Sequence, residues 1–442
     1  MAIKNDKNIG EELYSWAEDL FPICRSITGP GVRETLEYLK KILPKIKICS
    51  IPTGTKVFDW TIPDEWFIES AYIEDNRGNR VIDFNNNNLH IVGYSEPVDE
   101  WMDLKALNER LHSLPDQPDA IPYVTSYYNK NWGFCLTHTD RSKLSDVQYH
   151  VVIKSELKIG VLNYGELIIK GESDDEVLLS TYVCHPSMAN NELSGPVVAT
   201  GIAQWISTLS NLRYTYRIIF IPETIGSIAY LSQHADYLKK YTIAGLVLTC
   251  IGDNRDYSFL PSRDGNTLID RVSLHVLNNY VKKYTKYSYL ERGSDERQYC
   301  SPGIDLPVCS IMRSKYEEYP EYHTSLDDLS LISPEGLQGG FNVVKKIIKI
   351  LEFNKIYKNN ILCEPQLGKL NLYSCISTKN KNTRVVSDLI LDILAYMDGY
   401  NDVLQISELI GEDFFTVYKI VKDLIDKELV KGITPQQFKT TI

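Results

Sequence analysis

Apolar runs and amphipathic segments alternate along the second half of the chain. Residues 176–183 form a β-branched apolar run of the kind that makes a strand buried on both faces, and residues 196–209 follow with a helical pattern. The same order recurs three times, with strands expected at 216–223, 244–253 and 304–312. Helices of roughly 10 to 20 residues between strands are typical of a mostly parallel sheet with helices on both faces. The sequence therefore predicts an α/β fold.

The first 157 residues have a different pattern. Two amphipathic helices are expected within residues 1–60, and residues 61–157 alternate like strands and are rich in aromatic side chains. We expect an inserted β-rich domain at 61–157 and a discontinuous catalytic domain made of 1–60 and 158–375. Asn163-Tyr164-Gly165 predicts the turn of a hairpin that leads back to the main sheet.

Residues 376–442 are expected to form a separate domain. Three helical patterns with a turn at Gly411 are typical of a winged helix-turn-helix. The third helix begins with Glu412 and Asp413 and carries further aspartates, so it lacks the positive charge that phosphate contacts require. We expect this domain to contact a protein partner or a second copy of the chain rather than nucleic acid.

The length, charge and cysteine content of the chain limit the kinds of protein that it can be. The length of 442 residues and the hydrophobic content of 43% allow two or three domains, and the formal charge of −11 argues against a nucleic-acid-binding surface. The nine cysteines are scattered without a CxxC pair, so neither a disulfide framework nor a cysteine-rich zinc finger is indicated. No segment reaches the roughly 18 apolar residues of a membrane span, and the first residues lack a signal-peptide pattern. We expect a cytoplasmic protein with no membrane partner.

Four polar side chains each follow a predicted strand, namely His185, Glu223, Asp253 and His323. In open α/β sheets, ligands bind beyond the carboxyl ends of the strands, so these side chains should meet. Imidazole and carboxylate groups are the ligands of catalytic zinc sites, which need about three protein ligands and one open position. Together with Glu192 in the loop after His185, these residues supply that chemistry.

Each of these residues also has an ordinary structural interpretation. His185 could be a buried histidine bonded to a backbone carbonyl, and Glu223 could stabilise the start of the following helix. Glu192 and Asp253 could be solvated loop residues, and Asp295 could cap a turn. The interpretation as a site gains weight because the residues occur together at strand ends.

The order and spacing of these residues resemble the motifs of the zinc aminopeptidase superfamily. The motifs are His185, the NxxSG of Asn191 to Gly195, Glu223 followed by Gly226-Ser227, Ser294-Asp295, and His323-Thr324-Ser325 with Asp327. The whole chain is also similar to a bacterial family of aminopeptidase-like proteins that are often linked to polysaccharide biosynthesis. That family has an inserted β domain with a YYxxxWGFC segment, here Tyr127 to Cys135, and ends in a winged helix. The resemblance implies a hydrolase that cleaves an amide bond in a peptide or in a modified sugar.

The chain departs from the zinc aminopeptidases at three positions. Asn191 stands where those enzymes have an aspartate that bridges two metals, Pro222 stands at the position of their general base, and Thr249 stands at that of a further aspartate ligand. A neutral amide cannot hold two dications as an aspartate does. These departures therefore favour one zinc ion over two.

The resemblance and these departures together suggest roles for the site residues. The expected zinc ligands are His185, Glu192 and His323, the expected catalytic residues are Glu223 as general base and Asp295, and the further site residues are Asn191, Asp253 and Asp327. If Glu223 is instead a ligand, Asp295 or Glu192 must serve as the base. Asp253 could also compensate for Thr249.

Two other classes of function stay open at this point. The altered positions allow a metal-poor binding or scaffold protein whose site has decayed. A transcription regulator could also use the aminopeptidase-like domain to sense a ligand and the winged helix to act.

Overall fold

The computed structural model describes residues 8–370 and 386–433. The chain divides into two compact units, one of Met1–Asp270 with Lys282–Val344 and one of Arg271–Val281 with Lys345–Ile442. The three-domain boundaries expected from the sequence stay a prediction. Among the described residues, no helix combines the length and the apolar character that crossing a membrane requires.

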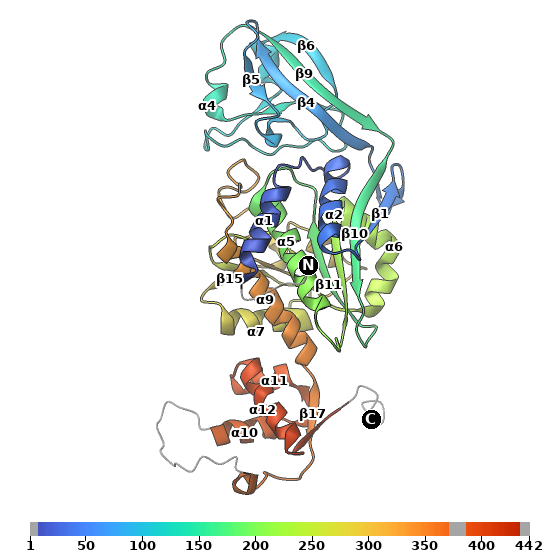
Figure 1. Ribbon diagram of the computed structural model, residues 1–442, viewed down its shortest axis with the longest axis vertical. Helices are drawn as coiled ribbons and strands as arrows, with labels where there is room; N and C mark the ends of the chain where they lie inside the picture. The colour runs from blue at the N-terminus through green and yellow to red at the C-terminus, as the bar shows by residue number, and fades with distance from the viewer. Residues whose placement is uncertain (1–7, 371–385, 434–442) are drawn as a thin grey trace. The chain divides into compact units, whose positions relative to one another are not determined.

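An eight-stranded sheet forms the core of the first unit (Figure 1). In order across the sheet, its strands are β1 (Lys47–Pro52), β10 (Val161–Ile169), β12 (Thr215–Ile221), β11 (Glu176–Tyr182), β13 (Thr242–Leu248), β16 (Val308–Met312), β14 (Tyr257–Leu260) and β15 (Tyr284–Lys286). The four central strands, β12, β11, β13 and β16, run parallel to one another. Every residue of β11, β12 and β16 is buried, as their continuous apolar runs predict.

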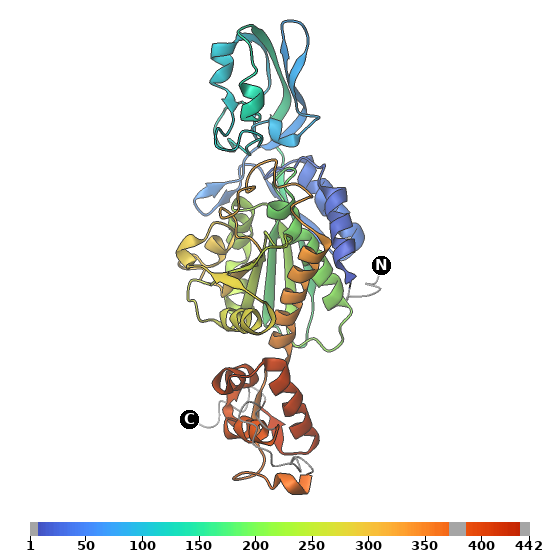
Figure 2. The same ribbon diagram turned by 90° about the vertical axis from the view of Figure 1, so that its left-hand side faces the viewer.

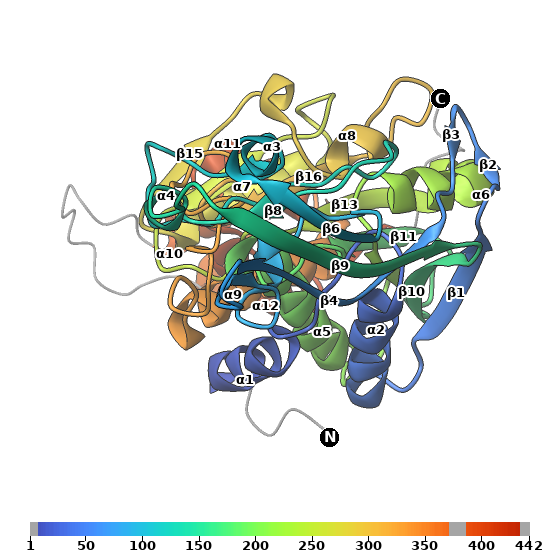
Figure 3. The same ribbon diagram turned by 90° about the horizontal axis from the view of Figure 1, so that it is seen from above.

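Helices cover both faces of this sheet (Figure 3). One face carries α1 (Gly10–Leu20), α2 (Pro30–Ile42) and α5 (Ser194–Ser207), and the other carries α6 (Ile225–Tyr241) and the short α8 (Glu296–Tyr299). The predicted α/β class, with a mostly parallel sheet between helices, is confirmed. Two more predicted helices are present, α7 (Leu268–Tyr280) and α9 (Pro334–Phe353).

The β-rich insertion is built on a second sheet of four strands, which Figure 2 shows as a separate layer. Its strands are β5 (Arg80–Asp83), β4 (Glu65–Asp75), β9 (Gln148–Lys158) and β6 (Val98–Asp103). A short strand pair and two short helices complete this region, namely β7 (Leu111–His112) with β8 (Phe134–Cys135), α3 (Leu104–Asn108) and α4 (His138–Arg141). A further short pair, β2 (Lys56–Val57) with β3 (Trp60–Thr61), precedes the second sheet, and β2 contacts α6. The predicted β-rich insertion is confirmed.

The predicted hairpin turn at Asn163-Tyr164-Gly165 is wrong. These residues lie inside β10, where Asn163 pairs with Ser50 of β1 and Gly165 pairs with both β1 and β12. These residues do not form a turn, because the strands on both sides of β10 satisfy its backbone hydrogen bonds. Gly165 serves packing instead, since a Cβ at this position would lie 3.0 Å from the side chain of Leu36.

The second unit contains a winged helix-turn-helix, coloured red in Figure 1. Its elements are β17 (Ile356–Asn359), α10 (Val386–Ala395), β18 (Asp398–Asp402), α11 (Val403–Ile410), α12 (Phe414–Asp426) and β19 (Val430–Gly432). Gly411 ends α11 in the left-handed conformation, with a φ of 71°, and Asp413 caps α12. The predicted helices and the turn at Gly411 are confirmed, whereas residues 376–385 and 434–442 lie outside the described part of the chain.

Candidate functional site

The loop between β11 and α5 carries His185 and is fixed by its own polar residues. The side chain of Asn190 accepts from the backbone N–H of Gly252 and donates to Asp253, both at 3.0 Å. Gly195 begins α5 so close to β13 that a Cβ would lie 2.2 Å from the carbonyl oxygen of Leu248. Part of the NxxSG motif therefore holds the loop against the neighbouring strand end.

His185 is buried and is held from one side by Glu192 and Arg25. Glu192 Oε2 accepts from both the backbone N–H and the Nδ1 of His185, each at 3.0 Å. Arg25 Nε lies 3.3 Å from Glu192 Oε1 and donates to the carbonyl oxygen of His185 at 2.9 Å. Burial opposes the charge of His185, but Cys184 and Glu192 outweigh it and raise the pKa of His185 well above its usual value. The Nδ1 side of the ring is thus fully engaged.

The opposite ring nitrogen of His185 faces Glu223, and the ring of His323 lies near that of His185. Nε2 lies 3.7 Å from Glu223 Oε2, and the ring centroid lies 5.5 Å from that of His323. Ser294 donates to Glu223 Oε1 at 2.7 Å and fixes the carboxylate. The side chain of Glu223 is 20% exposed and that of His185 is 5% exposed. Solvent therefore reaches the site from the side of Glu223.

The β-rich insertion contributes Tyr123 to this site. The ring of Tyr123 packs edge-on against His185 and His323, with centroid distances of 5.4 Å and 5.1 Å. Its backbone N–H donates to the carbonyl oxygen of His323 at 2.8 Å, and neighbouring residues of both segments are bonded to each other. His323 is held at a φ of 54°, and burial together with the charge of His185 lowers its pKa to about 3. Its imidazole is therefore neutral near pH 7.

Asp295 stands behind Glu223. Its Oδ1 accepts from the backbone N–H of Thr224 at 2.8 Å and from the hydroxyl of Ser227 at 2.7 Å. Its Oδ2 is buried without a hydrogen-bond partner. Burial and the neighbouring Glu223 raise the pKa of Asp295 to about 7, and burial also raises the pKa of Glu223. The predicted catalytic pair is thus brought together, with Asp295 contacting the residue that follows Glu223.

The carboxylate of Asp327 supports the loop rather than facing the histidines. It accepts from the backbone N–H groups of Asn190 at 2.6 Å and Asn191 at 3.0 Å, and from Tyr319 at 2.9 Å. Burial raises its pKa to about 6. Asp327 therefore fixes the backbone just before Glu192.

Asp253 and Asn191 also take structural positions. Asp253 accepts from the backbone N–H of Ser314 at 2.9 Å as well as from Asn190, and Asn191 Oδ1 accepts from Tyr182 at 2.7 Å. Asp253 and Glu192 are both buried, so the interpretation of these two residues as solvated loop carboxylates is wrong. The amide nitrogen of Asn191 is buried without a hydrogen-bond partner.

A metal ion could approach His185 from either side, and the two sides differ in charge. On the Nδ1 side, the ligand atoms of Cys184, His185 and Glu192 lie within 4.8 Å of one another. The guanidinium of Arg25 already neutralises Glu192 there, and burial raises the pKa of Cys184 to about 11, which opposes the thiolate that metals bind. A dication would add positive charge beside Arg25.

The Nε2 side offers a better donor set for zinc. Two imidazoles, from His185 and His323, and the carboxylate of Glu223 form a typical set for a catalytic ion. Two tetrahedral zinc ligands lie about 3.3 Å apart, and His185 Nε2 and Glu223 Oε2 are separated by 3.7 Å. Among the described residues, the one set of three whose ligand atoms all lie within 4.8 Å of one another is Cys184, His185 and Glu192. On the Nε2 side, the imidazole of His323 would therefore have to move closer to His185 and Glu223 to complete the set.

Two residues of the site were not predicted from the sequence. Arg25 lies in a loop between two helical patterns, and Tyr123 lies in an aromatic segment whose ordinary interpretation is a β-domain core. Both reach the histidines from distant parts of the chain. The local sequence gives one indication that Arg25 has a role, since it is a single arginine in an otherwise apolar segment. A buried arginine needs a partner.

The sequence matches a known family over most of its length. The profile described as "Domain of unknown function (DUF4910)" matches residues 14–354, and a winged helix-turn-helix profile matches residues 355–432. The chain belongs to the DUF4910 family and carries a C-terminal winged helix. Within that class, a Clostridium acetobutylicum protein is 44% identical over 436 residues, which cover 97% of this chain and 98% of the relative. It is named as a candidate polysaccharide biosynthesis protein with an aminopeptidase-like domain.

Solved structures extend the likeness to the aminopeptidase fold. The crystal structure of a candidate peptidase from Clostridium acetobutylicum has a TM-score of 0.91 at 42% identity, covering 98% of both chains. A zinc aminopeptidase from Bacillus subtilis has a TM-score of 0.58 at 13% identity, covering 79% of this chain and 96% of its own. A peptidase M28 precursor from Shewanella amazonensis has a TM-score of 0.56 at 12% identity, covering 81% and 98%. The last two show the fold alone, and the predicted resemblance is confirmed.

Proposed function

We propose that the chain is a zinc-dependent hydrolase of the aminopeptidase type that cleaves an amide bond in a peptide or in a modified carbohydrate. The observation that carries this proposal is the approach of His185 Nε2 to Glu223, with the ring of His323 beside them, beyond the ends of parallel strands and on a side that solvent reaches. The aminopeptidase-like fold and the name of the Clostridium relative support the same class of reaction.

In this proposal, His185, His323 and Glu223 would hold one zinc ion. When bound, zinc supplies a Lewis acid that polarises a carbonyl group and lowers the pKa of water. Glu192, predicted from the sequence as a ligand, is assigned instead to orient His185 through Nδ1, as a carboxylate commonly does for a ligating histidine. Arg25 pairs with that carboxylate at 3.3 Å.

Asp295 is the carboxyl group left to move the proton. Glu192 is engaged by His185 and Arg25, and Glu223 is assigned as a ligand, so Asp295 is the remaining carboxyl group. Its Oδ2 is buried without a hydrogen-bond partner, as is Glu192 Oε1. We assign Asp295 Oδ2 to accept the proton of the attacking water and to return it to the leaving amine. Ser294 meanwhile keeps the Glu223 carboxylate in place.

Zinc-loaded protein, tested on a panel of aminoacyl p-nitroanilides and N-acetylated amino sugars, should release product in a chelator-sensitive reaction. Loss of a general base lowers kcat by about 10²- to 10⁴-fold, so Asp295→Asn should keep its zinc and lose activity to that extent. Asp146→Asn, an exposed aspartate in the insertion, serves as the matched control. Full activity of Asp295→Asn would contradict the assigned role, and a zinc-loaded parent inert on the whole panel would contradict the hydrolase.

A further inference from the structure

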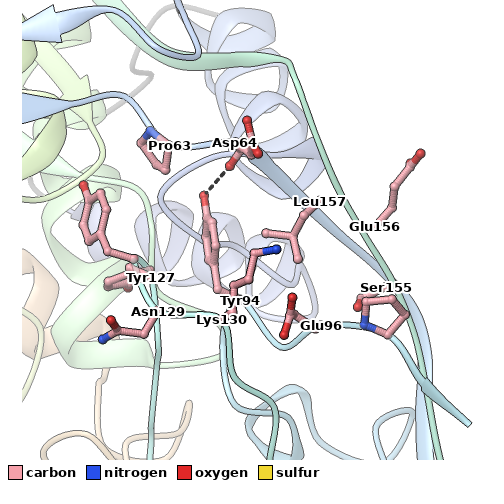
Figure 4. Close-up of a pocket in the computed structure, with 12 residues that line it drawn as sticks. Pro63, Asp64, Tyr94, Glu96, Tyr127, Asn129, Lys130, Ser155, Glu156 and Leu157 are labelled. Carbon is pink, nitrogen blue, oxygen red and sulfur yellow. Dashed lines mark hydrogen bonds between the residues drawn. The ribbon is translucent and has the colours of Figure 1, made fainter.

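A cavity of about 560 Å³ lies in the β-rich insertion (Figure 4). Four segments of the chain line it, at residues 63–64, 94–97, 127–130 and 155–157. Its volume is typical of cavities that bind small molecules. None of the predicted catalytic or metal-binding residues lines it, so the proposed reaction leaves the cavity unexplained.

One wall of the cavity adjoins the histidine site. Tyr127 lines the cavity, and its hydroxyl is hydrogen-bonded to that of Tyr123 at 2.6 Å. The ring of Tyr123 in turn packs against His185 and His323. A pair of tyrosines therefore separates the cavity from the candidate metal ligands.

Aromatic rings form the walls and the rim. Tyr94 is buried and fixed, because its hydroxyl bonds to Thr28 at 2.6 Å and donates to the carbonyl oxygen of Asp64 at 3.1 Å. Its ring meets that of Tyr127 edge-on, with a centroid distance of 5.5 Å (Figure 4). Tyr128, which also lines the cavity, is 51% exposed and packs against Trp60, which is 38% exposed.

These two aromatic side chains give a ligand in the cavity an apolar surface at the rim. Their faces, and those of the tyrosines behind them, suit the C–H face of a sugar ring, which is flat, apolar on one side and fringed with hydroxyl groups.

Polar side chains of the cavity could form hydrogen bonds to the hydroxyl groups of a bound sugar. Glu96, Asp64 and Lys130 line the cavity, and none of these three has an ion-pair partner among the residues that the structure describes. Glu156, a third carboxylate of the lining, is paired with Lys158 at 2.7 Å. The free groups are therefore two carboxylates and one ammonium, and the excess of negative charge disfavours an anionic ligand.

We propose that this cavity binds a pyranose ring that carries no negative charge, such as a neutral sugar or an amino sugar. The ring would stack on the tyrosines, Glu96 and Asp64 would accept from hydroxyl or amino groups, and Lys130 would donate. Binding of the sugar stands independently of catalysis. The further step, that the sugar belongs to the hydrolase substrate, rests on the proposed function.

Saturation-transfer NMR and calorimetry on the full chain test this proposal. The four probes are glucose, galactose, glucosamine and N-acetylglucosamine, and the negatively charged glucuronate serves for comparison. At least one of the four probes should bind saturably, with a Kd of about 1 mM or tighter, and glucuronate should bind more weakly. Tyr128→Ala and Glu96→Gln should each weaken binding about tenfold. Tyr400→Ala, a tyrosine that is 66% exposed in the second unit, should leave it unchanged.

His323→Ala separates this proposal from the proposed hydrolase. The variant should bind the sugar as the parent does, because Tyr128, Glu96 and Lys130 do not depend on a metal. Sugar binding by a chain without hydrolytic activity would contradict the proposed function alone. Absence of saturable binding for all four probes, or unchanged binding in Tyr128→Ala, would overturn the sugar site.

Discussion

The contacts of Glu192 bear directly on the role that we propose for its side chain. Its carboxylate lies on the Nδ1 side of His185 and is neutralised by Arg25, and both charged side chains are fully buried. Removing one partner of a buried ion pair destabilises the protein, because the remaining charge is then buried without water or an opposite charge. The orientation of His185 therefore depends on an arginine from the N-terminal segment.

Arg25→Met should destabilise the protein by about 3–5 kcal/mol, the usual consequence of leaving a buried charge unpaired. The double variant Arg25→Met/Glu192→Gln should regain part of this stability, since it removes both charges. Urea unfolding measures both effects. Lys143→Met, which breaks an exposed pair with Asp140, is the control and should change stability by less than about 1 kcal/mol. A double variant no more stable than Arg25→Met would contradict the pairing.

The sequence predicts some of these residues and misses others for a physical reason. His185, Glu223 and His323 could be predicted to meet because parallel strands bring their carboxyl ends to one edge of a sheet. Arg25 and Tyr123 could not, because loop packing between distant segments leaves no periodic pattern. The expectation that Glu192 is a ligand stays a prediction, because the sequence cannot show which side of the His185 ring its carboxylate occupies.

At the scale of elements, the packing of α5 against β13 positions the loop that carries His185. Ser194 donates to the carbonyl oxygen of Asn190 at 2.5 Å and accepts from the backbone N–H of Ile251 at 2.8 Å. The strands themselves could be predicted, since continuous apolar runs mark buried parallel strands. The segment at Asn163 to Gly165 was misassigned because a local turn signal cannot reveal the two neighbouring strands.

Gly195→Ala should destabilise the protein by about 1–3 kcal/mol or more, because the added methyl group would meet the carbonyl oxygen of Leu248 and push α5 outward. Thermal unfolding measures the loss. The control is Gly368→Ala, where nothing lies within 4 Å of the new atom, and its effect should stay within about 0.5 kcal/mol. Equal stability of the two variants would show that the close approach of α5 to β13 does not constrain the fold.

At the scale of the whole molecule, the second unit contains both a segment of α7 and the winged helix. Within it, His275 Nε2 accepts from the backbone N–H of Phe414 at 2.9 Å, at the start of α12. Leu409 and Tyr400 are large apolar side chains that remain exposed in this unit. A protein partner or a second copy of the chain for the winged helix stays a prediction.

The second unit should lose stability as the pH falls below about 6.5, the usual pKa of histidine. Burial lowers the pKa of His275 in the folded state, although Glu408 and Asp413 act in the opposite direction. The unfolded chain then binds the proton more readily than the folded chain, so acid favours unfolding. Protonation would also remove the acceptor for Phe414.

Hydrogen exchange of the α12 amides at pH 8 and pH 5.5 measures this effect in the parent and in His275→Gln. The glutamine can accept from Phe414 but cannot be protonated, so the variant should show a smaller difference between the two pH values. The same pH dependence in both proteins would contradict a role for His275.

In the function that we propose, one zinc ion binds on the Nε2 side of His185. Elemental analysis of protein purified without chelators or an affinity tag tests it most directly, in the parent and in His323→Ala, Glu223→Ala, Cys184→Ala and Glu192→Gln. We predict about one zinc per chain in the parent and in Cys184→Ala, none in His323→Ala or Glu223→Ala, and an affinity about 10- to 100-fold weaker in Glu192→Gln. Zinc retained in His323→Ala and Glu223→Ala but lost in Cys184→Ala would place the ion on the Nδ1 side and contradict the account. A parent without metal would contradict the zinc site altogether.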